Sequence, residues 1–196
     1  MSGQIVFFVA DAGQESGRTV DPPLDDSWRF WQPSLVRVKP RGESLWPFGV
    51  WWIAHHCRLF QGREYALLLR YQNGALVHRS CIFPKFYRFP FMGRGDLQVG
   101  DVWTAPAYRG RGMAARALKA ILRRFPHRAV WYVCEESNVA SIRVAEGAGM
   151  RITGFGTRTK RFGLRALGQF RVLSTEPSSG RSSTNWHRNP AFKGLQ

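Results

Sequence analysis

The sequence predicts an α/β domain of the α+β type, with helices flanking a mixed, twisted β-sheet. Asn73-Gly74 joins two apolar segments, Glu64–Tyr71 and Ala75–Phe83, and this dipeptide is typical of a two-residue β-hairpin turn. Further along, an amphipathic segment from Gly112 to Arg124 separates two short apolar runs. The hairpin and the helix between two strands together predict a domain of mixed α and β structure.

The remaining elements follow from apolar patterning and from glycine and proline breakers. A mostly buried helix is expected within Ser44–Phe60, beginning after Pro47, and another from Asn138 to Ala148, ending at Gly149. Gly100 is a candidate β-bulge. Strands are expected at Ile5–Ala10, Ser34–Lys39, Leu97–Thr104, Ala129–Cys134, Met150–Thr159 and Leu167–Leu173.

Composition divides the chain into three parts. Residues 1–33 combine a strand with an irregular, proline-broken arm, and residues 34–175 form the main domain. Residues 176–196 are rich in Ser, Gly, Asn and Pro, so this tail is expected to be disordered.

The chain is strongly basic, with 29 Lys and Arg against 13 Asp and Glu in 196 residues, a net charge of +16. This charge predicts attraction of anions such as nucleic acid, anionic lipid or a phosphorylated cofactor. No apolar run is long enough to cross a membrane. The three cysteines lie singly, which predicts neither disulfides nor a zinc site and favours a reducing cytoplasm. No metal site is expected.

The segment from Val102 to Ala114 joins a strand to a helix through a turn containing Gly110 and Gly112. The first turn of a helix presents backbone N–H groups without internal partners, and glycines let a phosphate approach them. Arg109 and Arg111 add positive charge at the same place. The segment therefore predicts an anion site, although a tight loop whose glycines only satisfy turn geometry fits the same residues.

Arg109-x-x-Gly112-x-Ala114 resembles the acetyl-CoA signature of the GCN5-related N-acetyltransferase (GNAT) superfamily, Gln/Arg-x-x-Gly-x-Gly/Ala. Asn138 matches the asparagine that commonly begins the family's next helix, and Gly149-Met150 matches the Gly-Phe pair that ends it. The resemblance covers about residues 97–155.

The resemblance implies a GNAT-like sheet in which two central parallel strands, Leu97–Thr104 and Ala129–Cys134, splay apart. Acetyl-CoA or another acyl-CoA would enter the gap, with its pantetheine paired to backbone near Trp103 and Thr104. Asn138 and Ser141 would lie beside the pantetheine arm. Backbone amides would hold the pyrophosphate at Arg109, Gly110, Arg111, Gly112, Met113 and Ala114.

The implied activity is N-acetyl or N-acyl transfer by direct attack of a primary amine on the thioester. Such a reaction needs a base for the amine, hydrogen bonds to the oxyanion and a proton for the thiolate. Candidate bases are Asp101, Glu135 and His78. The family's proton-donating tyrosine falls at Ala145, which makes Ser141, one turn earlier, the candidate donor.

The resemblance places the acceptor site near Ser44–Phe60 and Phe83–Met92. The aromatic side chains of Phe83–Met92 either line a pocket for a ring-bearing or anionic acceptor or pack in the core. A nucleotide-linked amino sugar suits the basic charge, and a peptide amine or an amine-bearing antibiotic remains open. Two other function classes remain: a non-catalytic acyl-CoA sensor of the same fold, and a basic nucleic-acid-binding module. The sequence does not predict the oligomeric state.

Overall fold

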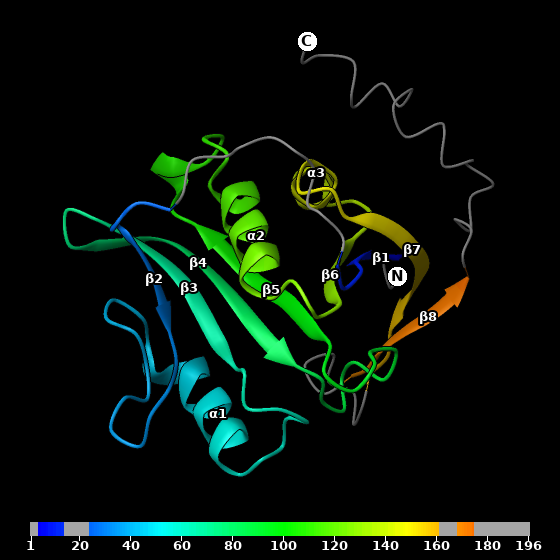
Figure 1. Ribbon diagram of the computed structural model, residues 1–196, viewed down its shortest axis with the longest axis horizontal. Helices are drawn as coiled ribbons and strands as arrows, with labels where there is room; N and C mark the ends of the chain where they lie inside the picture. The colour runs from blue at the N-terminus through cyan, green and yellow to red at the C-terminus, as the bar shows by residue number, and fades with distance from the viewer. Residues whose placement is uncertain (1–3, 14–23, 161–167, 175–196) are drawn as a thin grey trace.

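A computed structural model describes residues 4–13, 24–160 and 168–174 of the chain. Its strands form one eight-stranded sheet in the order β2-β3-β4-β5-β6-β1-β7-β8, with β2 and β8 at the edges (Figure 1). The tail predicted to be disordered, 176–196, lies outside the described residues.

Helices and strands are interspersed along the chain. The helical elements are α1 (Leu45–His56), the 3-10 turn η1 (Pro106–Tyr108), α2 (Met113–Arg124) and α3 (Val139–Gly147). The strands are β1 (Ile5–Ala10), β2 (Trp28–Trp31), β3 (Ala66–Gln72), β4 (Ala75–Pro84), β5 (Leu97–Thr104), β6 (Val130–Glu135), β7 (Arg151–Arg158) and β8 (Phe170–Ser174).

The N-terminal strand β1 lies in the interior of the sheet, between β6 and β7 and antiparallel to both. All six of its residues are buried. An apolar run without alternation is typical of a strand that is covered on both faces. Strand β1 therefore joins β7 and β8 to the other five strands of the sheet.

The hairpin predicted from Asn73-Gly74 is confirmed. Strands β3 and β4 are antiparallel, and Gln72 pairs with Ala75 across the turn. Both turn residues have positive φ, 51° for Asn73 and 76° for Gly74, which is the backbone of a type I′ turn.

The two central parallel strands, β5 and β6, separate after a short paired stretch. Their pairing runs only from Leu97 with Val130 to Val99 with Tyr132. Just beyond Val99, β5 contains a bulge in which Ser80 of β4 faces both Asp101 and Val102, and Asp101 has a φ of 46°. The predicted splay is confirmed, and the bulge lies one residue after Gly100.

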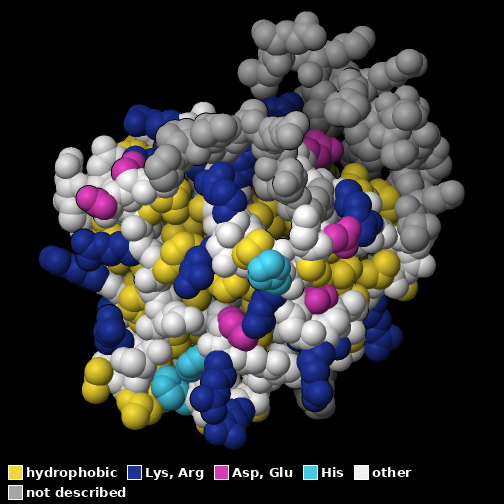
Figure 2. Space-filling view, in the orientation of Figure 1, with side chains coloured by type: hydrophobic (Ala, Val, Ile, Leu, Met, Phe, Trp, Pro, Cys, Tyr) yellow, Lys and Arg dark blue, Asp and Glu magenta, His cyan; other side chains and the backbone are white. Residues whose placement is uncertain are grey.

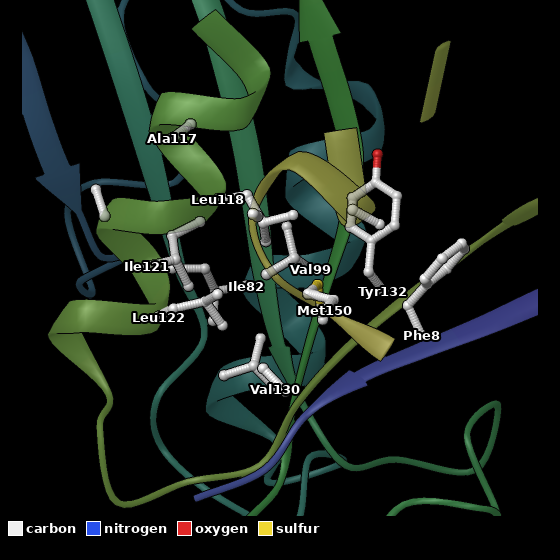
Figure 3. Packing of buried hydrophobic residues seen from close by; sticks show 14 of the residues in the cluster. Phe8, Ile82, Val99, Ala117, Leu118, Ile121, Leu122, Val130, Tyr132 and Met150 are labelled. Carbon is white, nitrogen blue, oxygen red and sulfur yellow. The ribbon is translucent and has the colours of Figure 1, made fainter. Parts of the chain in front are cut away.

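The helices cover opposite faces of this sheet. Helices α2 and α3 pack through Leu118, Ile121 and Ile142 on the face that also buries Val99 and Tyr132. Figure 3 shows Leu118 and Ile121 of α2 directed toward Val99 and Ile82. Helix α1 packs on the other face against a separate cluster of buried residues that includes Phe48, Leu67, Leu69, Phe83 and Phe86.

Three expectations for the first sixty residues are wrong. Residues 28–31 form an edge strand rather than part of an irregular arm, because they pair with β3. Ser34–Lys39 forms no strand; Ser34 and Arg37 make only an isolated bridge around a turn. Helix α1 lies within the expected segment, at Leu45–His56, but it is not mostly buried, since Leu45 is 62% and Trp46 79% exposed. Trp46 has a ψ of 120° because it precedes a proline, which disfavours helical backbone.

Candidate active site

A cavity of about 720 Å³ opens where β5 and β6 separate. Its walls come from the end of β5, the loop through η1, the first turn of α2, the start of α3, and Tyr132 of β6. Nine of the ten residues expected at the cofactor line it: Trp103, Thr104, Arg109, Gly110, Gly112, Met113, Ala114, Asn138 and Ser141. The tenth, Arg111, does not.

The glycines at the start of α2 satisfy a real backbone requirement. Gly110 and Gly112 have φ values of 73° and 69°, in the left-handed region that favours glycine. A Cβ on either residue would meet no atom within 4 Å, so the space beside them is open. The first hydrogen bond within α2 runs from the Arg116 N–H to the Gly112 carbonyl at 3.0 Å, which leaves the N–H groups of residues 112–115 without a helical acceptor.

The two arginines of the loop have structural contacts of their own. The Arg109 Nε–H donates to the Thr104 carbonyl at 3.1 Å, which ties the loop to the end of β5. The Arg111 guanidinium lies over the Tyr108 ring, 5.2 Å from its centroid. Arg109 therefore holds its charge at the cavity wall, whereas Arg111 lies over the ring of Tyr108, a lining residue, without lining the cavity itself.

Helix α3 contributes polar groups from its first turn. Asn138 is the N-cap, and its Oδ1 accepts a hydrogen bond of 3.1 Å from the Ser141 N–H. The cap uses only the carbonyl oxygen of the side chain, so the Asn138 amide NH₂ still has its donors for a ligand in the cavity.

Tyr132 is the site residue that the sequence did not predict. It lines the cavity, is 4% exposed, and lies in the last residue pair before β5 and β6 separate. Burial raises the pKa of Tyr132, while a hydrogen bond with the Ser141 side chain acts in the opposite direction. Figure 3 shows its hydroxyl directed away from the packed aliphatic residues, among which Met150 and Val130 lie below the ring. Its only signal in the sequence is that it shares a strand face with the buried Val130.

Asp101 lies at the β5 bulge but does not line the cavity. Its Oδ1 accepts from Arg79 Nη2 at 3.0 Å, and Arg79 also pairs with Glu43 at 2.5 Å. The Arg79 guanidinium lies 5.8 Å from the centroid of the Trp103 ring. Asp101 therefore faces the α1 side of the sheet, across β5 from the cavity. Glu135 is an exposed residue at the end of β6 and also does not line the cavity.

His78 is fully buried in β4, next to the cavity wall. Its Nδ1 hydrogen-bonds Thr104 Oγ1 at 2.8 Å, and its Nε2 hydrogen-bonds Ser80 Oγ at 2.9 Å. Burial, with a smaller contribution from the nearby positive charge of Arg70, lowers the pKa of His78 to about 4. His78 is therefore uncharged at neutral pH, and it reaches the cavity only through Thr104.

We expect His78 to make the fold sensitive to mild acid. Its folded pKa of about 4 lies below the ordinary 6.5, so the unfolded chain takes up the proton first as the pH falls. The stabilisation is complete above pH 6.5 and is lost between 6.5 and 4, by as much as ~3 kcal/mol. Urea unfolding at pH 7 and pH 4.5 should show a larger loss for the wild type than for His78→Gln. Equal losses would mean that His78 is not the responsible group.

The aromatic segment Phe83–Met92 belongs to the core rather than to a pocket wall. Phe83, Phe86 and Phe89 are at most 5% exposed and pack with Phe60 and Tyr65. Apolar side chains gain most by leaving water together, and these rings contact one another. Of the two readings left open by the sequence, core packing is therefore the correct one for these three rings.

The face of the molecule seen in Figure 2 carries basic side chains without one dominant patch. Figure 2 shows Lys and Arg side chains spread over the visible face, with acidic side chains scattered between them. Within the described residues, no group of His, Cys, Asp and Glu is arranged to hold a metal ion. None of the described helices has the length and apolar character needed to span a bilayer.

Comparisons with known proteins agree with this geometry. A sequence profile of the acetyltransferase (GNAT) family matches residues 27–150. A GCN5-related N-acetyltransferase from Sphaerobacter thermophilus superimposes with a TM-score of 0.51 at 17% identity over 79% of this chain, and shows a common fold. A GNAT-family acetyltransferase from Novosphingobium aromaticivorans gives a TM-score of 0.48 at 18% identity, also over 79% of this chain.

The chain spans 50% and 62% of the lengths of those two proteins. No curated protein matches the sequence. The family profile covers well over half of the chain, including β5, the glycine loop and α3. The chain belongs to the acetyltransferase (GNAT) family.

Proposed function

We propose that this protein is an N-acyltransferase that uses acetyl-CoA or another acyl-CoA as co-substrate. The observation that carries the proposal is the start of α2, where left-handed glycines leave open space beside unpaired backbone N–H groups in a cavity between diverging strands. A diphosphate fits such a helix start because the N–H groups and the helix dipole both favour negative charge.

The rest of the cavity suits the pantetheine arm. Beyond Val99, β5 makes no further pairs with β6, so the edge of β5 at Trp103 and Thr104 offers backbone groups to an extended ligand. The Asn138 amide lies across the cavity from that edge. An arm held between them would carry its thioester toward the point of separation, beside Tyr132.

The two faces of β5 supply the groups that acyl transfer needs. On the cavity side, the Tyr132 hydroxyl is placed to give its proton to the departing thiolate, with Ser141 as its hydrogen-bond partner. On the α1 side, Asp101 would accept the proton of an amine that approaches over the bulge; its position at the bulge supports this role. The oxyanion would be held by backbone N–H groups of the bulge.

A proton donor in the cavity favours the enzyme over the non-catalytic sensor. The test is thiol release from acetyl-CoA, followed colorimetrically with a panel of amines: simple alkylamines, amino sugars, amine-bearing antibiotics and short peptides. We expect at least one amine to raise thiol release well above hydrolysis, with an N-acylated product by mass spectrometry. Acyl-CoA binding without product from any amine would support the sensor, and DNA binding without acyl-CoA binding would support the nucleic-acid module.

Substitutions of Asn138 should separate its two roles. Asn138→Asp keeps a side-chain oxygen for the Ser141 N–H but loses the NH₂ donors, so we expect near-normal stability and weaker acetyl-CoA binding. Asn138→Ala loses both functions, and the lost cap should cost about 1 kcal/mol in addition. Thermal unfolding and calorimetry with acetyl-CoA measure the two effects. Unchanged acetyl-CoA affinity in Asn138→Asp would restrict Asn138 to capping.

A further inference from the structure

A second hollow, of about 590 Å³, lies beside the edge strand β2 and is strongly basic. Arg29, Arg37, Lys39 and Arg41 line it, against one acidic residue, Asp26. Within the described part of the chain, none of these four basic side chains forms an ion pair. Four like charges around one concave surface repel one another, and an anionic ligand would relieve that repulsion.

Aromatic rings complete the walls of this hollow. Trp31 and Tyr71 line it and are half-buried. Phe30 also borders the hollow, but it pairs with Leu68, so its ring points to the opposite face of the sheet from Arg29 and Trp31. Exposed ring faces stack on flat heterocycles, and neighbouring arginines bind phosphate oxygens in pairs. The two features together suit a ligand that carries both a ring and phosphate.

The loop between β2 and α1, which carries Arg37, Lys39 and Arg41, is held in place by hydrogen bonds at several points. Ser34 and Arg37 exchange backbone hydrogen bonds of 3.2 and 3.1 Å, and the Trp52 Nε1–H of α1 donates to the Ser34 carbonyl at 2.8 Å. The Tyr71 hydroxyl donates to the Arg41 carbonyl at 2.9 Å. The hollow is therefore formed before any ligand arrives, which lowers the entropic cost of binding.

Strand register relates this hollow to the reaction centre. Arg29 of β2 pairs with Leu69, Leu69 pairs with Arg79, and Arg79 pairs with Trp103 of β5. These residues form one row across the α1 face, and three strand spacings separate Arg29 from Trp103 by about 14 Å. Leu69 is buried and the Arg79 guanidinium lies 5.5 Å from the centroid of the Phe48 ring, so a ligand would pass over the side chains that cover the middle of this row. A nucleoside diphosphate that carries one further ring can span this distance.

We propose that the hollow beside β2 binds the nucleoside diphosphate part of the acceptor, whose amine then lies at Asp101 and Trp103. The role of this ligand as an acyl acceptor rests on the acyltransferase function proposed above. Binding of the ligand in the hollow does not depend on that function, because the hollow and the acyl-CoA cavity share no lining residue.

The first test is calorimetry with UDP, which lacks the adenine of CoA, in the presence of saturating CoA. We expect UDP to bind under these conditions and the affinity to fall at least tenfold in Arg37→Glu/Arg41→Glu. Arg94→Glu/Arg171→Glu is the matched control: both residues are exposed, neither lines the hollow, and the net charge changes equally. Absence of UDP binding, displacement of UDP by CoA, or equal loss in both double variants would overturn the proposal.

A second test separates this proposal from the acyltransferase assignment. Gly112→Asp should weaken CoA binding and leave UDP binding unchanged, whereas Arg37→Glu/Arg41→Glu should do the reverse. In acyl-transfer assays, the Arg37/Arg41 variant should raise the KM for UDP-glucosamine at least tenfold and leave kcat/KM for free glucosamine unchanged. Equal effects on both amines would refute the proposed acceptor.

A third test compares UDP with decathymidylate, because a single-stranded nucleic acid also presents rings and phosphates to the hollow. We expect UDP to bind more tightly than decathymidylate at 150 mM salt. Tighter and strongly salt-dependent binding of decathymidylate would assign the hollow to nucleic acid and overturn the acceptor proposal.

Discussion

Replacement of Gly112 by aspartate is expected to weaken acetyl-CoA binding by at least 100-fold. The open space beside Gly112 is where the diphosphate is proposed to lie, and a carboxylate there would face two negative charges. Two like charges 4 Å apart repel by about 4 kcal/mol in the dielectric typical of a protein surface, which corresponds to about three orders of magnitude in affinity. Isothermal titration calorimetry with acetyl-CoA measures the loss.

Gly112→Asn is the matched control for this substitution. Asparagine has nearly the size of aspartate and tolerates the left-handed φ of 69° as well as aspartate does, but it carries no charge. We expect Gly112→Asn to weaken binding by only about tenfold, since it fills part of the same space without charge repulsion. If both variants bind acetyl-CoA like the wild type, the phosphate assignment is wrong. Equal and severe losses of acetyl-CoA affinity in both variants would show that the added side-chain volume, rather than its charge, prevents binding.

Replacement of Tyr132 by phenylalanine should lower kcat for acyl transfer by about 10²- to 10⁴-fold, the usual range for removal of a general acid. The ring would remain packed among Val130, Ile142 and Phe155 in the buried cluster, so the fold should tolerate the change. Because burial raises the pKa of Tyr132, the hydroxyl keeps its proton at neutral pH and can donate it to a thiolate. Steady-state kinetics with saturating acetyl-CoA and the best acceptor give the value.

Two controls keep this result specific. Acetyl-CoA affinity should change less than about threefold in Tyr132→Phe, because the proposed role concerns the leaving group rather than binding. Ser141→Ala removes the hydrogen-bond partner of Tyr132 and should reduce kcat by less than Tyr132→Phe does. An unchanged kcat in Tyr132→Phe would remove this tyrosine from the mechanism and return Ser141 to consideration.

Local chemistry explains which parts of the fold the sequence predicted. The Asn73-Gly74 turn and the glycine loop before α2 depend on backbone that few residues adopt, so the residue types themselves carry the information. The amphipathic pattern of α2 depends on residues three and four apart. Such features can be read within a window of about fifteen residues.

Non-local pairing explains what the sequence could not predict. Strand β1 lies in the interior of the sheet, where Ile5 pairs with Glu135 of β6 and Gly156 of β7, and nothing near Ile5 in the sequence specifies those partners. The edge strand β2 has only four residues and no clean alternation, so its pairing with β3 determines it. Helix α1 has long apolar residues on several sides, and the sequence did not show which of them would face the sheet.

The site residues divide in the same way. The loop proposed to bind phosphate could be recognised because its residues are contiguous, and nine of the ten residues expected at the cofactor line one cavity. Tyr132, the proposed proton donor, was not predicted because the resemblance implied a donor on α3, at the position of the fully buried Ala145. A tyrosine on β6 reaches the same cavity only because β5 turns away at the bulge after Gly100.

A crystal structure with CoA bound would show whether the start of α2 holds the diphosphate. We expect the diphosphate oxygens to lie within about 3 Å of backbone nitrogens between Gly110 and Ala115, with the pantetheine sulfur near Tyr132. A diphosphate bound anywhere else on the molecule, with the start of α2 left to solvent, would contradict this expectation.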